Sequence, residues 1–425
     1  MKVLVIGGGG REHALCLALS RDPGVTELHC APGNAGIAEL ATLHAVNAAD
    51  PNAVADLADA LDVDLVVVGP EGPLVAGAAD AVRLRGIACF GPSAAAATLE
   101  GSKAFAKEVM AAAEVPTAMA RVCDDLEEVA AALDAFGPPY VVKDDGLAAG
   151  KGVVVTGDRE AALAHAKACS GRVVIEEFLD GPEVSVFALT DGQTVRALQP
   201  AQDFKRVGDG DSGPNTGGMG AYSPLPWAPA DLLDQVTSRV LEPTIEEMRR
   251  RGTPFVGLLY AGLALTSRGL RVVEFNARFG DPETQVVLAL LRNPLGALLE
   301  AAAIGRLDKA EPLTWREGSA VTVVVAAHNY PGTPRTGDPI RGLDDANALA
   351  GVHVIHAGTA RNDGGDVVSA GGRVLCVTAT GDDLAQARER AYAGVAAIDL
   401  AGSHHRTDIA LTAERGEVVV PGAPA

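Results

Sequence analysis

The chain has 425 residues, a length that allows two to four domains. Hydrophobic residues make up 48% of it and charged residues 21%, which is typical of a globular protein. The formal net charge of −20 excludes a nucleic-acid backbone as partner, because that partner requires a basic face, but small anionic ligands need only a local cluster of positive charge.

Cysteine usage and hydropathy indicate the compartment. The six cysteines form no C-x-x-C pair, which argues against a zinc site or a redox motif and fits a reducing cytosol. No run approaches 18 apolar residues, and the apolar start "MKVLVI" is too short for a signal peptide. We therefore expect a cytoplasmic protein that binds neither membranes nor nucleic acid.

Residues 1–100 alternate short apolar runs with helical stretches. The runs are Val3–Ile6, Glu27–Cys30, Leu65–Val68 and Ile87–Phe90, with Ala-rich segments between them. This βαβ series predicts a parallel sheet with right-handed crossovers. A glycine-bearing loop follows each run, and such loops converge on one crevice where backbone N–H groups can meet a ligand.

The first of these loops matches a dinucleotide-binding turn only in part. Gly7-x-Gly9 opens a helix, but Glu12 occupies the third glycine position, and the second strand ends in "CAPGN" without an acid for a ribose hydroxyl. Both features that identify a nicotinamide-nucleotide site are missing. The helix N-terminus could still hold a monophosphate, and a tight turn without a ligand is the alternative.

A second unit covers residues near 115–190. "PPYVVKDDGLAAGKGVVVT" predicts two strands joined by a Gly/Ala loop, followed by a helix over Arg159–Ala168 and two more strands. The loop from Gly146 to Gly152 differs from a Walker A loop in its glycine spacing and precedes β-branched residues instead of a helix. We interpret it as a flap over phosphates that carries Lys151, with a plain hairpin turn as the alternative.

The segment 203–226, "DFKRVGDGDSGPNTGGMGAYSPLP", has neither helical nor strand periodicity. Its length predicts a functional or disordered loop. A linker consists mainly of Gly and Ser, whereas this segment carries charged, amide and aromatic side chains. The sequence therefore favours a loop that covers a substrate over a linker.

The stretch "VVEFNARFGDPETQ", residues 272–285, places polar side chains at the end of an apolar strand. Alternation puts Glu274 and Asn276 on one face of that strand, and Arg278 follows. Two hard oxygen ligands beside a guanidinium suit Mg²⁺ and a phosphate. We expect Asp281 to be the N-cap and Pro282 the first residue of the next helix. A solvated strand end with an ordinary cap is the alternative.

A separate unit is predicted from about residue 322, with mixed or antiparallel strands and a helix over Asp382–Ile398. It contains no evident chemistry, and the adjacent His404 and His405 are interpreted as surface residues. The central region, in contrast, combines lysines, an acid pair and the Glu/Asn/Arg cluster. Phosphoryl transfer needs such cations and a metal in a closed, dry site.

Specific blocks extend this reading: "GGREHAL", "APGNAG", "VGPEGPLV", "FGPS", "LEGSKAFAK", "DGLAAGKGV", "VIEEFLDG", "KRVGDGDSGPNTGGMGAYSP", "FNARFGDPETQ" and "GGRVLCVTA". With these blocks, from residue 1 to about 420, the chain resembles the phosphoribosylamine–glycine ligase family of the ATP-grasp superfamily. "GPNTGGMGAYSP" and "RFGDPETQ" are the most specific of them.

The resemblance implies a multidomain α/β and α+β protein with an ATP-grasp fold. Residues 1–101 would form an N-terminal, Rossmann-like pre-ATP-grasp domain with a parallel sheet. Residues 102–320 would form the ATP-grasp domain, with a lid subdomain at about 115–190, and residues 321–425 a small mixed α/β C-terminal domain. The implied reaction joins glycine to phosphoribosylamine and converts ATP to ADP and phosphate, as the second step of purine synthesis. The enzyme is expected to be a monomer that uses Mg²⁺ or Mn²⁺.

The resemblance also implies roles for individual residues. Catalysis would use Arg278, Lys143, Asn215 and Gly217. The ATP-binding residues would be Lys103, Lys143, Gly150, Lys151, Glu176, Glu177, Leu179 and Glu183, and the metal ligands Glu274 and Asn276. The other substrates would contact Gly9, Gly10, Gly33, Asn34, Gly69, Pro70, Glu71, Asp203, Lys205, Asn215, Thr216, Gly217, Gly218, Met219, Gly220 and Arg278.

Three alternatives remain open at this point. Another ATP-grasp enzyme, such as a purine-pathway carboxylase or formyltransferase, would share the lysines and the metal cluster but should lack "GPNTGGMGAYSP". A nicotinamide-dependent oxidoreductase is disfavoured by Glu12. A non-catalytic nucleotide-binding module gives no reason to keep Glu274, Asn276 and Arg278 together.

Overall fold

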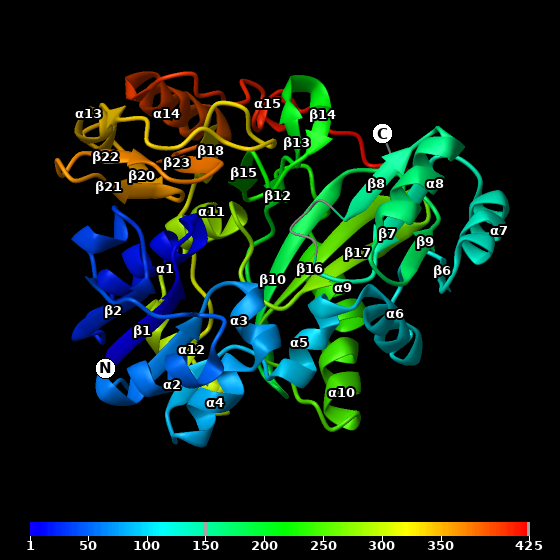
Figure 1. The fold of residues 1–425 in the computed structure, drawn as a ribbon, viewed down its shortest axis with the longest axis horizontal. Coiled ribbons are helices and arrows are strands. Elements are labelled where there is room, and N and C mark those ends of the chain that lie inside the picture. Colours follow the sequence, from blue (N-terminus) through cyan, green and yellow to red (C-terminus); the bar gives the residue numbers. More distant parts are fainter. Residues whose placement is uncertain (148–151, 423–425) are drawn as a thin grey trace.

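A computed structural model describes residues 1–147 and 152–422 of the chain (Figure 1). The predicted flap residues Gly150 and Lys151 therefore lie outside the described residues. Within the described residues, no helix combines the length and the apolar character that crossing a membrane requires.

The N-terminal unit contains the predicted parallel sheet, in the order β3-β2-β1-β4-β5. Its strands are β1 (Lys2–Gly7), β2 (Glu27–Pro32), β3 (Thr42–Leu43), β4 (Leu65–Val68) and β5 (Ala88–Phe90), and its helices are α1 (Gly10–Ser20), α2 (Pro51–Ala60), α3 (Glu71–Ala76) and α4 (Ala78–Leu84). All four apolar runs are strands, as predicted. All four residues of β4 are buried, because helices cover both faces of a parallel sheet.

The lid is an antiparallel sheet, in the order β6-β9-β7-β8, with two helices packed against it. Its elements are β6 (Ala120–Cys123), α7 (Leu126–Phe136), β7 (Tyr140–Asp144), β8 (Val153–Thr156), α8 (Arg159–Ala168) and β9 (Val173–Glu176). The lid has a small hydrophobic core of its own. Its last strand ends at Glu176, so the next strand, although within the predicted range 115–190, belongs to another sheet.

That next strand, β10, pairs with β16 in the central sheet, whose order is β11-β10-β16-β17. The strands are β10 (Glu183–Asp191), β11 (Val195–Ala197), β16 (Val256–Thr266) and β17 (Gly269–Asn276). The helices around them are α5 (Ala94–Gly101), α6 (Lys103–Ala112), α9 (Leu232–Val236), a π-helical turn (Thr237–Leu241), α10 (Glu242–Arg250), α11 (Glu283–Leu290) and α12 (Leu295–Ala303).

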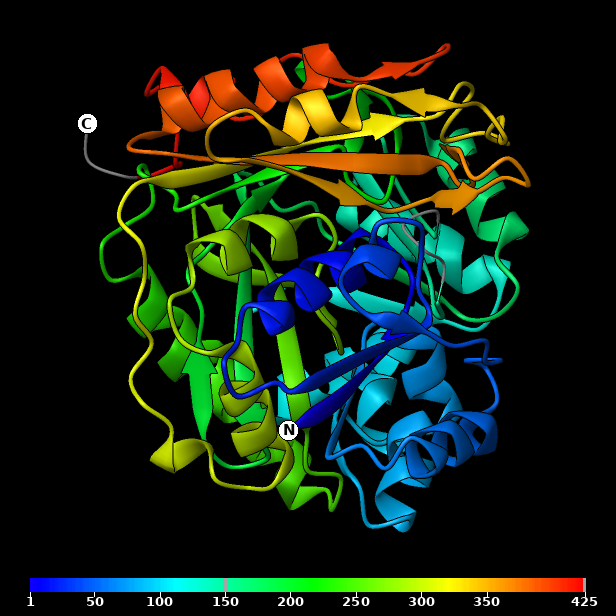
Figure 2. The same ribbon diagram turned by 90° about the vertical axis from the view of Figure 1, so that its left-hand side faces the viewer.

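The C-terminal sheet, in the order β12-β15-β18-β23-β20, is antiparallel throughout and lies across the N-terminal and central units (Figure 2). Its strands are β12 (Gln202–Asp203), β15 (Gly220–Ser223), β18 (Ser319–Ala326), β20 (Val352–His356) and β23 (Arg373–Gly381). Smaller elements are the ribbons β13 (Arg206–Gly208) with β14 (Ser212–Asn215), β19 (Ile340–Arg341) with β24 (Asp399–Leu400) and β21 (Thr359–Arg361) with β22 (Val367–Ser369), and the helices α13 (Leu343–Asn347), α14 (Leu384–Ala397) and α15 (Leu411–Glu414).

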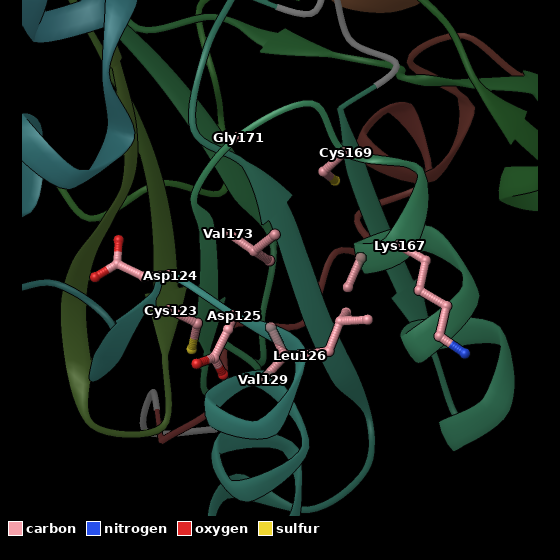
Figure 3. Close-up of a pocket in the computed structure, with 10 residues that line it drawn as sticks. Cys123, Asp124, Asp125, Leu126, Val129, Lys167, Cys169, Gly171 and Val173 are labelled. Atoms are coloured by element: carbon pink, nitrogen blue, oxygen red, sulfur yellow. The ribbon is translucent and has the colours of Figure 1, made fainter.

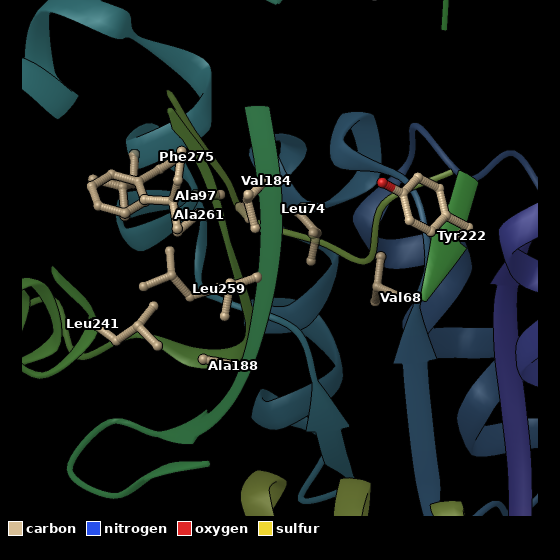
Figure 4. Close-up of a cluster of buried hydrophobic side chains, with 14 of the residues drawn as sticks. Val68, Leu74, Ala97, Val184, Ala188, Tyr222, Leu241, Leu259, Ala261 and Phe275 are labelled. Carbon is tan, nitrogen blue, oxygen red and sulfur yellow. The ribbon is translucent and has the colours of Figure 1, made fainter. Parts of the chain in front are cut away.

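Two predictions about this region were wrong. Segment 203–226 is not free of strands, since it contributes β13, β14, β15 and part of β12, and the C-terminal sheet is not confined to residues after 322. Strands of two to four residues, interrupted by Gly and Pro, are too short for an alternating pattern to be recognised. One continuous core of buried side chains runs from the N-terminal unit through the central sheet to Tyr222 on β15 (Figure 4).

Candidate active site

The N-terminus of α1 is closed by a side chain of the helix itself. The Glu12 carboxylate accepts a hydrogen bond from the Gly9 N–H at 2.6 Å and lies 2.5 Å from the Arg11 guanidinium. A Cβ at Gly69 would lie 2.1 Å from the Glu12 carboxylate, so position 69 has no room for a side chain. Glu12 thus replaces the glycine that would allow close helix–strand packing, and it places a negative charge at the helix N-terminus where a dinucleotide site holds its pyrophosphate.

Asn34, a predicted substrate ligand, is engaged inside the protein. Its amide nitrogen donates to the carbonyl oxygens of Gly8 and His356, each at 2.9 Å, and its amide oxygen accepts from the N–H groups two and three residues later in the chain. The residue is only 7% exposed. Its side chain therefore joins the N-terminal unit to β20.

Close packing accounts for two of the other predicted glycines. A Cβ at Gly10 would lie 2.8 Å from Nε2 of Gln285 on α11, and a Cβ at Gly33, where φ is +73°, would lie 2.4 Å from Leu43. Such distances are shorter than any ordinary contact. At Gly33 the positive φ favours glycine whether or not a ligand binds, whereas at Gly10 a side chain would have to displace the end of Gln285.

Arg278 lies between two carboxylates from different helices. Its guanidinium is 3.1 Å from Glu100 on α5 and 3.3 Å from Glu71, which begins α3 directly after Pro70. Burial opposes the charge, but Glu100 and Glu71 outweigh it and raise the pKa of Arg278. The arginine thus carries a fixed positive charge where the N-terminal unit meets the end of β17. Glu100 was not singled out in the sequence, although it precedes Lys103 by three residues.

Glu274 and Asn276 lie at the carboxyl end of β17, as predicted, opposite Gly262 and Tyr260 of β16. Burial alone would raise the pKa of Glu274, but nearby positive charges, led by Lys205, Lys143 and Lys103, lower it below its usual range. The Asn276 amide oxygen accepts a hydrogen bond of 3.3 Å from Arg278. The end of the strand therefore presents a carboxylate whose ionised form nearby lysines favour, together with an amide oxygen that Arg278 contacts.

This donor set suits a hard divalent cation that also binds phosphate oxygens. Mg²⁺ uses one or two protein oxygens together with water and phosphate, whereas a site closed by protein alone needs more ligands. Residues 1–147 and 152–422 contain no group of three His, Cys, Asp or Glu side chains at ligand spacing. Glu274 and Asn276 thus fit the open type of site.

Three charged side chains connect the lid to the rest of the protein. Glu176, only 3% exposed at the end of β9, is 2.8 Å from Lys143 of β7 and 2.9 Å from Lys107 of α6. Lys143 also donates to the carbonyl oxygen of Val273 on β17, at 3.0 Å. Glu176 and Lys143 were predicted site residues, but Lys107 was not. It lies one helical turn after Lys103 on α6, and that spacing is the only signal the sequence offers.

Lys103 and Glu177 hold neighbouring points of the lid. Lys103 donates to the carbonyl oxygen of Gly146 at 2.8 Å, and burial lowers the pKa of Lys103. The Glu177 carboxylate accepts from the Met119 N–H at 2.9 Å and lies 2.9 Å from Arg268. Two residues further along the chain, Leu179 lies in the connection between β9 and β10.

Lys205 lies between two carboxylates, those of Glu183 and Asp203. It contacts Glu183 of β10 directly, and its ammonium is 3.9 Å from Asp203. Burial, opposed by Lys205, raises the pKa of Asp203 to about 7, while Asp203 and Glu183 overcome burial and raise the pKa of Lys205. These groups form one charged cluster with Glu274, whose pKa Lys205 lowers.

The segment 215–220 bends back over this cluster. Thr216 donates to the carbonyl oxygen of Lys205 through both its N–H, at 2.7 Å, and its hydroxyl, at 2.9 Å. The Met219 side chain is fully buried and Gly220 begins β15, so their side of the segment belongs to the core. The Asn215 side chain makes no hydrogen bond within the described residues.

Comparisons with known proteins agree with these features. Models of the N domain, the ATP-grasp (A) domain and the C domain of phosphoribosylglycinamide synthetase match residues 1–100, 101–284 and 320–412. Phosphoribosylamine–glycine ligase of Streptomyces coelicolor is 72% identical over 97% of this chain and 99% of its own length. The chain belongs to the phosphoribosylamine–glycine ligase family. The Mycobacterium tuberculosis member is 56% identical over 99% of this chain and 100% of its own length.

Solved structures place the family member among ATP-grasp folds. The crystal structure of phosphoribosylamine–glycine ligase from Thermotoga maritima is 34% identical, with a TM-score of 0.83 over 96% of this chain and 100% of that one. A biotin carboxylase domain from Hydrogenobacter thermophilus is 17% identical, with a TM-score of 0.72 over 95% of this chain and 91% of that one, and shares the fold. The family confirms the predicted multidomain α/β ATP-grasp fold and rules out the nicotinamide-dependent alternative.

One local prediction is corrected in this family member. Asp281 is not the N-cap of α11, because the helix begins at Glu283 after Pro282, and Asp281 does not bind its free N–H groups. The Asp281 carboxylate instead accepts from Gln285 at 2.8 Å and pairs with Arg373 at 3.3 Å. A charged partner from β23 therefore outcompetes the local capping role.

Two surface hollows lie away from the charged cluster. One, of about 210 Å³, is on the lid between α7 and α8, where Cys123, Asp125, Lys167 and Cys169 line it (Figure 3). The other, of about 290 Å³, follows α12 around Ala297. Neither includes a predicted site residue, so the charges at the end of β17, rather than the shape of these hollows, identify the candidate active site.

Proposed function

We propose that this chain joins glycine to 5-phosphoribosylamine, producing glycinamide ribonucleotide, ADP and phosphate through a glycyl phosphate intermediate. This is the second step of de novo purine synthesis. Family membership supports the overall reaction. The observation that carries the assignment to a site is the carboxyl end of β17, where Glu274 and Asn276 lie beside Arg278 and where the positive charges of Lys205, Lys143 and Lys103 lower the pKa of Glu274.

The chemistry explains why ATP is needed. A carboxylate is a poor electrophile, so a glycine oxygen first attacks the γ-phosphorus of ATP and ADP departs. The amine of phosphoribosylamine then attacks the acyl carbon, the carbon–oxygen bond to phosphate breaks, and the amine loses a proton. Water would hydrolyse the acyl phosphate, so a lid that excludes water is required.

The residues divide this work by charge. Glu274 and Asn276 would hold Mg²⁺ or Mn²⁺, which offsets negative charge on the phosphates. Lys103, Lys143, Gly150 and Lys151 would hold those phosphates, Arg278 the transferred phosphoryl group, and Asn215 and Gly217 the glycine. The adenosine would contact Glu176, Glu177, Leu179 and Glu183.

Lys143 must change partners for this role. In the described structure it is paired with Glu176 and with the Val273 carbonyl oxygen. A phosphate carries more negative charge than either partner, so an incoming nucleotide can draw the ammonium away. The lid would close through this exchange of ion-pair partners.

Phosphoribosylamine would occupy the crevice of the N-terminal unit. The N–H groups of Gly9, Gly33 and Gly69 already donate to the Glu12 carboxylate, the Gly7 carbonyl oxygen and the Ile6 carbonyl oxygen. The phosphate of phosphoribosylamine would therefore use other N–H groups of these loops. We also propose the domain limits 1–101, 102–320 and 321–425, a monomeric state and a cytoplasmic location. The matched ranges 1–100, 101–284 and 320–412 support these limits.

ADP release tests the proposal directly. The purified chain is incubated with ATP, Mg²⁺ and freshly prepared phosphoribosylamine, with and without glycine. ADP should appear only when glycine is present, together with glycinamide ribonucleotide. Equal ADP release without glycine would reject the reaction. Transfer of ¹⁸O from glycine carboxylate to the released phosphate would support the acyl phosphate, and its absence would exclude that intermediate.

A further inference from the structure

The exposed peptide of Gly217 is held on both sides by side chains of the C-terminal unit. Its N–H donates to the Tyr330 hydroxyl at 3.1 Å, and its carbonyl oxygen accepts from the Arg373 guanidinium at 2.7 Å. The guanidinium also lies against the face of the glycine, since a Cβ there would be 3.0 Å from its central carbon. Tyr330 belongs to "AAHNYPG", a stretch to which the sequence assigned no role.

Both side chains are themselves fixed. The Tyr330 ring lies on Gly372, where a Cβ would be 2.3 Å from the ring, and Arg373 follows directly as the first residue of β23. Arg373 donates a second hydrogen bond, of 2.6 Å, to the carbonyl oxygen of Asp281. It therefore connects the peptide of Gly217 to the turn that follows Arg278.

The same peptide leads to the charged cluster. The Gly218 N–H donates to the Thr216 hydroxyl at 3.0 Å, and Thr216 donates to the carbonyl oxygen of Lys205. The Lys205 ammonium lies among Asp203, Glu183 and Glu274. A continuous series of contacts thus runs from the C-terminal unit to the two loops that flank the proposed glycine site.

We propose that Tyr330 and Arg373 are positioning residues for the ligation, acting through the peptide of Gly217 on Lys205 and on the Arg278–Asp281 turn. This inference rests on the proposed function. The C-terminal unit would then set the geometry around glycine without touching ATP.

Two conservative substitutions test the inference. Tyr330→Phe removes one hydroxyl, and kcat/KM for glycine should fall about fivefold, the effect of one neutral hydrogen bond. Arg373→Lys loses the paired donors, and kcat/KM for glycine should fall roughly tenfold to a hundredfold. KM for ATP and the melting temperature should stay close to those of the parent.

The same unit offers matched controls. The Tyr392 hydroxyl also accepts from a backbone N–H, that of Ile409 at 3.1 Å, and Arg388 also donates to two carbonyl oxygens, those of Ile409 and Thr407. Arg388 and Arg373 are equally exposed, at 20%. Tyr392→Phe and Arg388→Lys should leave kcat/KM for glycine unchanged.

The outcomes separate the two proposals. A parent chain without glycine-dependent ADP release would reject the proposed function before any variant is compared. With an active parent, unchanged kcat/KM for glycine in both variants would overturn the positioning role. Equal losses for glycine and ATP, or loss of the fold in both variants, would also overturn it, because the residues would then be only structural.

Discussion

The lid and the C-terminal unit join the central sheet in different ways. The lid has a hydrophobic core of its own, and buried charges, Lys107, Glu176 and Lys143, link it to its neighbours. The C-terminal unit shares the main core, pairs its strands with β15, and is tied to the N-terminal unit through Asn34. Charged partners can be exchanged for phosphates, whereas a shared core cannot separate without unfolding. We therefore expect the lid to move and the C-terminal unit to keep the site aligned.

Removal of Glu274, at the end of β17, should have the largest effect. The positive charges of Lys205, Lys143 and Lys103 favour its ionised carboxylate, and the proposed metal site would lose its only carboxylate ligand. Glu274→Ala should therefore lower kcat by about a thousandfold, the scale of losing a main electrostatic stabiliser. Steady-state kinetics at saturating substrate measures this. Glu246→Ala, at an exposed acid of α10, is the control. Activity within a few-fold of the parent would remove the metal assignment.

Asn34→Ala would weaken the attachment of the C-terminal unit to the N-terminal unit. It leaves two carbonyl oxygens and two N–H groups unpaired in a buried position. The free energy of unfolding should fall by about 3 kcal/mol, as measured by urea denaturation. Asn362→Ala, at an exposed asparagine, should change it little. An unchanged unfolding midpoint for Asn34→Ala would show that this junction does not support the unit.

Lys107→Met would change the ion pairs that attach the lid to its neighbours. Glu176 would then have Lys143 as its only lysine partner among the described residues and would hold it against the pull of the phosphates. KM for ATP should rise about tenfold, equivalent to about 1.4 kcal/mol. Lys309→Met, at an exposed lysine, should leave it unchanged. A KM for ATP equal to that of the parent would argue against partner exchange as the closing step.

Low pH should weaken the attachment between the N-terminal and C-terminal units, where His13 of α1 meets His356 of β20. Burial first, with help from neighbouring positive charge, lowers the pKa of His13 to about 3 and that of His356 to about 4. As the pH falls through about 6.5, these histidines bind protons in the unfolded chain but not in the folded chain. The free energy of unfolding that is present above this pH therefore decreases as the pH falls. In the parent, His13 should account for about 1 kcal/mol of the decrease in the free energy of unfolding between pH 6 and 5, and His13→Gln should remove this contribution. An unaltered pH dependence of the melting temperature would contradict this.

The sequence predicted those parts of the fold that rest on local patterns. The four apolar runs of the N-terminal sheet, the strand end at Glu274 and Asn276, and the helix after Asp382 all follow from periodicity. The parts it missed depend on distant partners. β10 joins β16 and not the lid, and Asp281 binds Arg373 instead of capping α11.

The same limit applies to the site. Lys107, Tyr330 and Arg373 contact backbone groups or carboxylates that lie far away in the chain. Such contacts leave no spacing that a local pattern can reveal. The variants above test the roles carried over from the family resemblance.

The order of strands in the C-terminal sheet bears on how the chain is made. β12 and β15 are synthesised well before β18, β20 and β23. The edge of β15 that pairs with β18 therefore stays unpaired during part of synthesis. A fragment that starts at residue 319 would expose the flank of β18 that β15 covers, with unpaired backbone along it. Such a piece would tend to aggregate, so recombinant expression of this unit requires residues 202–223 as well.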